Sequence, residues 1–221
     1  MDTVTSDKLR VLLSHGLSHP QLATLLARQR AEEPRVKVQL SESDPSLTSR
    51  QFSNGQYDIG ISRSAIIDEQ WDAVPLWREP WVVATSIHSP LRQSLSVTMD
   101  QLIDCPFIHW DPVLCYENYR ELNAILESLG NPQPAGTRVV RTFDMMMTLV
   151  ASGQGVTITP ASKVKRYLPW GVIGRFLADV PLTTTVCLIQ RSRIDTTSAW
   201  WRFSQRALSI DWETNCKLAS I

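Results

Sequence analysis

The sequence lacks an excess of charge of either sign, since Lys and Arg together number 22 and Asp and Glu together also number 22. Proteins that hold nucleic acids through their phosphate groups usually have a surplus of basic residues. These residues are therefore poor candidates for direct contact with DNA. Only 4 cysteines occur, with no C-x-x-C pair and no metal-ligand spacing to the 4 histidines. We expect free thiols in a reducing compartment, no metal site and no cofactor.

Long apolar runs and the common catalytic motifs are also absent. No cationic segment followed by an apolar one opens the chain, and no apolar run of about 18 residues occurs. The sequence contains no G-x-S-x-G, H-E-x-x-H, P-loop or G-x-G-x-x-G pattern, because Gly153 and Gly155 lack a third glycine. We therefore expect a cytoplasmic protein that neither crosses a membrane nor acts as an enzyme.

The clearest pattern that is present is a strand–helix–strand unit within Thr137–Pro160. Val139–Arg141 predicts a strand, Thr142 can cap the helix that follows, and Gly153 favours the end of that helix. Val156–Thr159 predicts the second strand, and a unit of this kind needs a parallel sheet. Open sheets of this class bind ligands at the carboxyl ends of their strands. The unit therefore predicts a pocket for a small molecule.

The start of the chain predicts strands and helices in alternation. Ser18 and Gln21 have the spacing of a capping box at the start of the first helix, and Asp44 before Pro45 favours a second helix start. Alternating or apolar runs predict strands at Lys8–Ser14, Val36–Leu40 and Asp58–Ser62. This order is typical of one half of a doubly wound α/β fold.

The rest of the chain predicts a second lobe and a return to the first. Two strands are expected at Asp72–Leu76 and Pro80–Thr85, separated by a turn at Arg78–Glu79, and the first crossing between lobes is placed near Thr85. Thr183–Gln190 is long enough to return to the first lobe. At 221 residues the chain can form two lobes. We expect residues 1–85 with 184–214 in one lobe, 86–183 in the other, 215–221 as a tail, and a ligand cleft between hinged lobes.

Four segments, in this order, resemble the effector-binding domain of LysR-type transcriptional regulators. They are KLRVLLSHG from Lys8, FSNGQYDIGISR at Phe52–Arg63, REPWVVATSIHSPL at Arg78–Leu91, and LVASGQGVTITP at Leu149–Pro160. The resemblance runs from Lys8 to Arg206, which is most of the chain.

The resemblance implies a two-lobed, type 2 periplasmic-binding-protein-like α/β fold, in which each lobe is a mostly parallel sheet flanked by helices. It also implies a small-molecule effector in the cleft, a homodimer or tetramer, and a winged helix-turn-helix before the effector domain. Only seven residues precede Lys8, so we expect the DNA-binding part, through which alone DNA would be contacted, to be missing from this sequence. Either the sequence is one domain of a longer protein, which we favour, or the protein lacks that part. The sequence is therefore expected to be the effector domain of a longer protein, with no membrane contact.

In the first lobe the resemblance points to the turn after the first strand, with Ser14, His15 and Gly16. Arg63 directly follows the third strand with Ser62 beside it, so we expect both at the mouth of the cleft. Hydroxyls and free amides at a helix start suit an anion or a carbonyl group, and the planar guanidinium of arginine suits a carboxylate. The alternatives are that Ser14 only satisfies local backbone, that His15 is solvated, and that Arg63 forms a surface ion pair with Asp68 or Glu69.

In the second lobe the candidates are Trp110 and Asp111 after one strand, Thr142 and Phe143 at the start of the central helix, and Thr159 near the end of the next strand. Trp110 could stack on a planar effector, or it could be a core residue. Thr142 could be used entirely as a helix cap. The side chains together favour a small carboxylate as the effector.

Two other classes of protein share this architecture. A solute-binding protein of a transport system would need an export signal, and a two-lobed dehydratase-like enzyme would need a catalytic threonine, which Thr142 or Thr159 could supply. The order of the four segments favours the regulator. We expect a switch, in which the effector biases closure of the lobes and so changes how paired subunits present a DNA-binding part.

Overall fold

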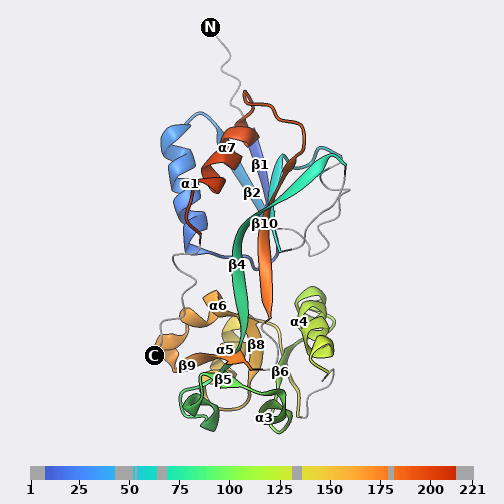
Figure 1. Ribbon diagram of the computed structural model, residues 1–221, viewed down its shortest axis with the longest axis vertical. Coiled ribbons are helices and arrows are strands. Elements are labelled where there is room, and N and C mark those ends of the chain that lie inside the picture. Colours follow the sequence, from blue (N-terminus) through green and yellow to red (C-terminus); the bar gives the residue numbers. More distant parts are fainter. Residues whose placement is uncertain are drawn as a thin grey trace. The chain divides into compact units, whose positions relative to one another are not determined.

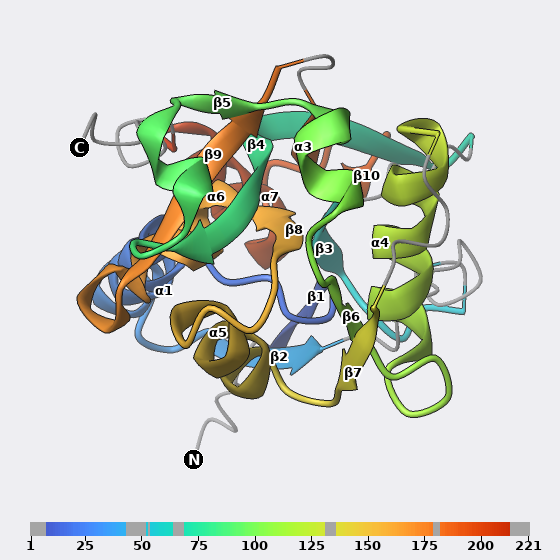
Figure 2. The same ribbon diagram turned by 90° about the horizontal axis from the view of Figure 1, so that it is seen from below.

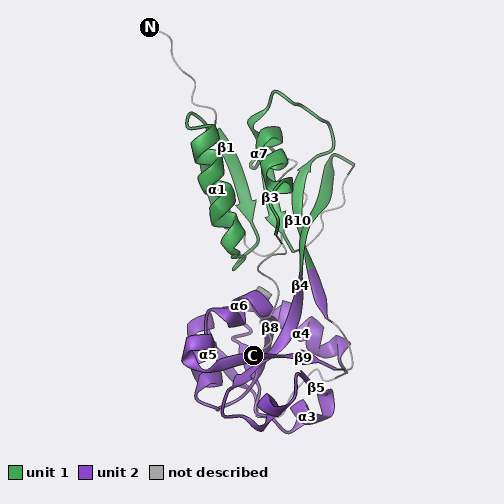
Figure 3. Cartoon of the chain, turned by 60° about the vertical axis from the view of Figure 1, so that its left-hand side comes forward, with its two compact units in different colours: residues 1–78, 185–217 green, residues 79–184, 218–221 purple. Residues whose placement is uncertain are grey.

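The computed structural model describes residues 8–42, 52, 54–63, 69–130, 136–178 and 182–212 (Figure 1). The helix expected from Asp44 and the tail at 215–221 lie outside the described residues. The chain forms two compact units, residues 1–78 with 185–217 and residues 79–184 with 218–221, which Figure 3 colours separately. Each unit is described by itself below.

One long strand, β4 (Trp71–Ser86), replaces the two strands and the turn that were expected in this segment. The prediction of a turn at Arg78–Glu79 is wrong because Glu79 is buried and its carboxylate accepts a hydrogen bond from the amide of Ser162, at 3.0 Å. Pro80 has no amide hydrogen to donate, but the strand continues, since the amide of Trp81 donates to the carbonyl of Leu182 at 2.9 Å. The first part of β4 belongs to unit 1 and the rest to unit 2.

Unit 1 is a sheet with helices packed on one of its faces. Its sheet has the order β2-β1-β3-β10-β4, in which β1, β2 and β3 are parallel and β10 is antiparallel to β3. The elements are β1 (Lys8–Leu13), α1 (Pro20–Glu32), β2 (Lys37–Glu42), β3 (Ile59–Ser62), β10 (Thr183–Arg191) and α7 (Ala199–Leu208). The expected α/β class and the three strands of the first half-domain are confirmed.

The core of unit 1 lies between the sheet and the helices α1 and α7. Alternate residues of β1 enter it, together with Leu25 of α1 and Phe203 of α7. The opposite face of the sheet is covered by a smaller cluster of Leu12, Phe52, Trp71, Cys187 and Ile189. Both faces of β1 are therefore buried from Val11 to Leu13, which explains the continuous apolar sequence of that part.

The start of α1 differs from the expected capping box. The cap is His19, whose Nδ1 accepts a hydrogen bond from the amide of Gln21 at 3.2 Å, and Pro20 is the first helical residue. Proline suits the first helical position because its φ angle is fixed and its missing N–H would have no partner there. Ser18 is thereby left outside the helix, so the capping-box prediction is wrong by one residue.

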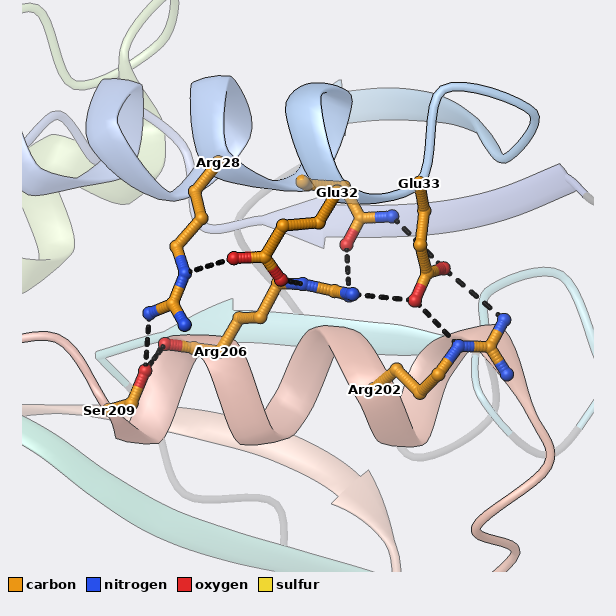
Figure 4. Close-up of polar contacts among 7 residues, drawn as sticks. Arg28, Glu32, Glu33, Arg202, Arg206 and Ser209 are labelled. Atoms are coloured by element: carbon orange, nitrogen blue, oxygen red, sulfur yellow. Dashed lines mark hydrogen bonds and ion pairs between the residues drawn. The ribbon is translucent and has the colours of Figure 1, made fainter.

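A network of ion pairs joins the C-terminal end of α1 to α7 (Figure 4). Glu33 accepts hydrogen bonds from Arg202 Nε and from Arg206 Nη2, each at 2.6 Å. Glu32 accepts from Arg206 Nε at 2.5 Å and from Arg28 Nε at 2.6 Å. Burial would raise the pKa of Glu33, but the hydrogen bonds from Arg202 and Arg206 outweigh it and lower the pKa to about 2. The network holds α7 against α1.

Unit 2 contains the second half of β4 and the strand–helix–strand unit that the sequence predicts. In its larger sheet, β4 is antiparallel to both β8 and β9, and β5 is parallel to β9. Strands β6 and β7 form a separate parallel pair (Figure 2). Its other elements are η1 (Pro90–Gln93), β5 (Ser96–Val97), α3 (Met99–Ile103), β6 (Ile108–Trp110), α4 (Tyr116–Ser128), β7 (Arg138–Val140), α5 (Phe143–Ala151), β8 (Thr157–Pro160), α6 (Ala161–Lys165), η2 (Leu168–Trp170) and β9 (Val172–Leu177).

The segment from β7 to β8 follows the prediction closely. Thr142 caps α5, since its side-chain oxygen accepts from the amide of Met145 at 3.2 Å. Gly153 follows the helix with φ of 74°, a left-handed conformation that favours glycine. At Gly155 the backbone passes so close to β6 that an added Cβ would lie 2.6 Å from the carbonyl oxygen of Pro106. The two glycines therefore have different roles, one in ending α5 and the other in a close strand approach.

Candidate functional site

Unit 1 has a topological switch point between β1 and β3. The chain leaves β1 for α1 and then β2 on one side, whereas it leaves β3 for β4 on the other side of the strand order. Open α/β sheets bind ligands at the carboxyl ends of the two strands where the connections diverge in this way. Ser14 directly follows β1, and Ser62 is the last residue of β3. The topology therefore places two of the predicted residues at the expected position.

The predicted residues of unit 1 are joined by hydrogen bonds at this edge. The hydroxyl of Ser14 donates to the hydroxyl of Ser62 at 2.9 Å and accepts from the amide of Arg63 at 3.3 Å. Ser62 is fully buried, and Ser14 is half-buried. Ser14 thus satisfies local backbone, as the alternative interpretation states, but it does so in direct contact with two other candidate residues.

Arg63 has an unsatisfied donor at this edge. Its side chain is half-buried, and its Nε atom is buried without a hydrogen-bond partner among the described residues. Asp68, one of the partners considered from the sequence, lies outside the described residues. A buried donor without a partner costs free energy, and a carboxylate is the group that the guanidinium fork binds best.

The turn between β1 and α1 is tight and depends on Gly16. The amide of Leu17 donates to the carbonyl of Ser14 at 3.0 Å, and Gly16 has φ of 63°. A positive φ at the third residue of such a turn favours glycine. His15, the second residue of the turn, is exposed, which agrees with the alternative that it is solvated.

Unit 2 has a second switch point, between β6 and β8. Phe107 and Val156 form a parallel bridge next to these strands, and the amide of Ile108 donates to the carbonyl of Val156 at 2.8 Å. The chain leaves β6 for α4 and β7 on one side, and leaves β8 for α6 and β9 on the other. Side chains of α4 pack with Phe107 and those of α5 pack with Ile108, so the two helices cover opposite faces of β6 (Figure 2).

The predicted residues Trp110 and Phe143 belong to one aromatic cluster beside this edge. Their ring centroids are 6.3 Å apart and the rings are inclined by 26°. Phe143 also contacts the ring of Tyr167 at 5.5 Å, and the ammonium group of Lys163 lies 5.1 Å from its centroid. Trp110 and Phe143 are both half-buried. Trp110 is therefore neither a fully buried core residue nor fully exposed to a ligand.

Lys163 and Tyr167 were not among the residues predicted from the sequence. Both follow β8 at the same carboxyl edge, so the position after a predicted strand was the signal that could have identified them. The hydroxyl of Tyr167 donates to the carboxylate of Asp144 in the first turn of α5. Burial raises the pKa of Tyr167, and the bond to Asp144 adds to this, so that the pKa reaches about 12.

The remaining predicted residues of unit 2 are already engaged or deeply buried. Asp111 Oδ1 accepts from the amides of Val113 and Leu114 at 2.9 and 3.0 Å, and its Oδ2 accepts from Arg141 Nε at 3.2 Å. The bonds from these amides, and then the one from Arg141, lower the pKa of Asp111. Its carboxylate therefore fixes the loop after β6. Thr159 is 3% exposed and lies opposite Val82 of β4.

Residues 3–209 match the family described as LysR substrate binding domain, so the chain belongs to that family. It is 27% identical to the Hca operon transcriptional activator HcaR of Escherichia coli over 139 residues, which are 63% of this chain and 47% of HcaR. It is 26% identical over 219 residues to the uncharacterized regulator YcgK of Bacillus subtilis, covering 89% of this chain and 64% of YcgK. The chain thus spans about half to two thirds of the length of these curated relatives.

Solved structures of effector binding domains show the same fold. The effector binding domain of BenM with benzoate superimposes with a TM-score of 0.76 at 20% identity, covering 91% of this chain and 90% of that one. The effector binding domain of QuiR in complex with shikimate gives 0.68 at 15% identity, covering 92% and 96%. The expected periplasmic-binding-protein-like fold is confirmed. Within the described ranges, no helix has the length and apolar character that a membrane span requires.

Proposed function

We propose that this chain is the ligand-sensing domain of a LysR-type transcriptional regulator and that it binds a small carboxylate. The observation that supports this most is the group of Ser14, Ser62 and Arg63 at the switch point of unit 1, where the Nε of Arg63 is buried without a partner among the described residues. A carboxylate would satisfy this donor.

Two relatives of known structure support the chemical class. BenM was solved with benzoate and QuiR with shikimate, and both molecules carry one carboxylate on a six-membered ring. In unit 2, the half-buried Trp110 at the end of β6 is the side chain that we propose for contact with the effector.

The proposed action is regulatory rather than catalytic. A ligand that binds one conformation better than another shifts the equilibrium between them, and only by as much as its two affinities differ. The curated relatives are transcriptional regulators, which favours this reading over a transport protein or an enzyme. Contact with DNA through another segment, a dimeric or tetrameric assembly and a cytoplasmic location belong to the same proposal.

The test is a thermal-shift screen of the chain with benzoate, shikimate and a series of aliphatic mono- and dicarboxylates, run on the wild type and on Arg63→Ala. A ligand at about 100 times its dissociation constant should stabilise the wild type by about 2.7 kcal/mol. Arg30→Ala is a matched control, because Arg30 is an exposed arginine of α1 in the same unit.

Stabilisation of the wild type and of Arg30→Ala, with loss in Arg63→Ala, would support the proposal. A carboxylate that stabilises all three proteins equally would exclude Arg63 as its anchor. If no carboxylate stabilised the wild type, whereas amines or neutral sugars did, the proposed ligand class would be wrong.

A further inference from the structure

The pairing of β6 with the segment before β8 ends before the candidate residue Trp110. The amide of Ile108 still donates to the carbonyl of Val156, but the bridge between these segments is confined to Phe107 and Val156. The amide of Trp110, which points to the same side of β6 two residues later, donates instead to Nδ1 of His109 at 2.8 Å. A side chain therefore takes the place of the missing strand neighbour.

This hydrogen bond fixes the protonation of His109. A backbone amide can only donate, so Nδ1 must present its lone pair to Trp110 and the neutral ring must carry its proton on Nε2. The carbonyl oxygen of Trp110 lies farther from Nδ1, at 3.3 Å, which agrees with this assignment. Burial lowers the pKa of His109, which favours the neutral ring.

The imidazole of His109 is buried and packs against α4. His109 is 3% exposed, its ring centroid lies 4.5 Å from that of Tyr119 in α4 and 6.1 Å from that of Phe107, and Nε2 has no hydrogen-bond partner among the described residues. A buried histidine that leaves one nitrogen unsatisfied costs free energy. The two polar contacts of its ring in the described structure both go to the backbone of Trp110, directly before Asp111 and the loop that Asp111 fixes.

We infer that His109 is a positioning residue, whose Nδ1 lone pair fixes the backbone at Trp110 and thereby holds the carboxyl end of β6 in the geometry needed for effector binding. The inference rests on the proposed function, since it assigns Trp110 to the effector site. It makes His109 a residue that acts on the ligand through Trp110 and not by contact.

Two substitutions of similar size separate this role from simple packing. His109→Asn and His109→Leu both remove the ring that contacts Tyr119 and both remove the Nε2 proton. Only asparagine supplies an oxygen near the position of Nδ1, where it can accept from the amide of Trp110. A difference in behaviour between His109→Asn and His109→Leu therefore measures the effect of the hydrogen-bond acceptor for the amide of Trp110.

The first measurement is amide hydrogen exchange by NMR on the labelled chain. We expect the amide of Trp110 to be protected in the wild type and in His109→Asn, and to exchange about tenfold faster in His109→Leu, the effect of losing one hydrogen bond. Nitrogen chemical shifts should show an unprotonated Nδ1 on one histidine, with its signal absent from both variants. Equal protection of Trp110 in both variants, or a protonated Nδ1, would overturn the inference.

The second measurement is the affinity for the carboxylate of the screen above that stabilises the wild type most, with benzoate as the first probe. We expect His109→Leu to bind about tenfold more weakly and His109→Asn to bind within a few-fold of the wild type. Binding that is equally weak in both variants, or unchanged in His109→Leu, would overturn the inference while leaving the proposed function intact. If no carboxylate bound the wild type, the proposed ligand class would fail, and the exchange of Trp110 would decide the local role of His109.

Discussion

Replacing Glu33 with glutamine should destabilise the protein in a way that depends on pH. Glu33 is the centre of the network between α1 and α7, with Arg202 Nε and Arg206 Nη2 each 2.6 Å from Oε1 and a side chain that is 13% exposed. Glutamine keeps the size and the carbonyl oxygen of the side chain but removes its charge. The substitution therefore tests the ion pairs with little change in packing.

The expected magnitude follows from the pKa of Glu33. Its value is lowered from 4.5 to about 2 in the folded protein, and each unit of difference corresponds to about 1.4 kcal/mol, so the charged form contributes up to about 3 kcal/mol at neutral pH. Because the folded pKa is lowered, this contribution is complete above the unfolded pKa and is lost as the pH falls toward the folded pKa. About half of it should remain near pH 3.3.

The assay is urea unfolding of the wild type and Glu33→Gln at a series of pH values from neutral to acidic. The difference in the free energy of unfolding should be large at pH 7 and should shrink steadily below about pH 4.5. Glu32→Gln is the control on the same pair of helices, and its effect should be smaller because the carboxylate of Glu32 is 41% exposed. A difference that is constant from neutral to acidic pH, or no difference at pH 7, would refute the reasoning.

Two further predictions concern unit 2. Gly155→Ala should destabilise the protein by about 2 kcal/mol, because the new Cβ would lie 2.6 Å from a backbone oxygen of Pro106 that cannot move freely. Urea unfolding measures this loss of stability. A neutral effect would contradict the close approach of the two segments. Tyr167→Phe should remove an ionisation near pH 12 from an alkaline ultraviolet titration, since the pKa of Tyr167 is raised to about 12. Because the folded pKa is raised, the stability that the neutral hydroxyl contributes is complete below pH 10 and is lost as the pH rises toward about 12. A titration curve that is the same for the wild type and Tyr167→Phe would contradict the assignment.

Local elements were predictable where neighbouring residues decide the backbone. Thr142 before an apolar helix and Gly153 after it define the ends of α5, and both were expected from the sequence. The start of α1 was missed by one residue because the capping-box pattern at Ser18 was preferred over the proline signal at Pro20. A histidine as cap has no strong signal in the sequence, since its role depends on the rotamer that the surrounding structure selects.

The candidate site was predictable only as a set of strand ends. The patterns at Lys8–Ser14 and Asp58–Ser62 placed Ser14 and Ser62 at strand ends, and the structure adds that their hydroxyls are 2.9 Å apart. Their separation of 48 positions in the chain is closed by the parallel pairing of β1 with β3. Asp111 was expected to face the ligand, but the structure shows both of its oxygens accepting from the loop and from Arg141, which the order of residues does not reveal.

The sequence by itself determined the class of fold, the order of most strands and helices, and the family, because these depend on periodicity, caps and motifs within short stretches of chain. Tertiary structure alone decided which distant groups meet. Glu33 pairs with Arg202, which is 169 positions away in the chain. Glu79 is buried in a continuous strand where a turn was expected. The side chain of His109 accepts a hydrogen bond from the amide of Trp110, where the pairing of β6 with the segment before β8 has ended. Each of these contacts exists because burial leaves a polar group without water, and the partner that satisfies it is set by packing in space and not by distance along the chain.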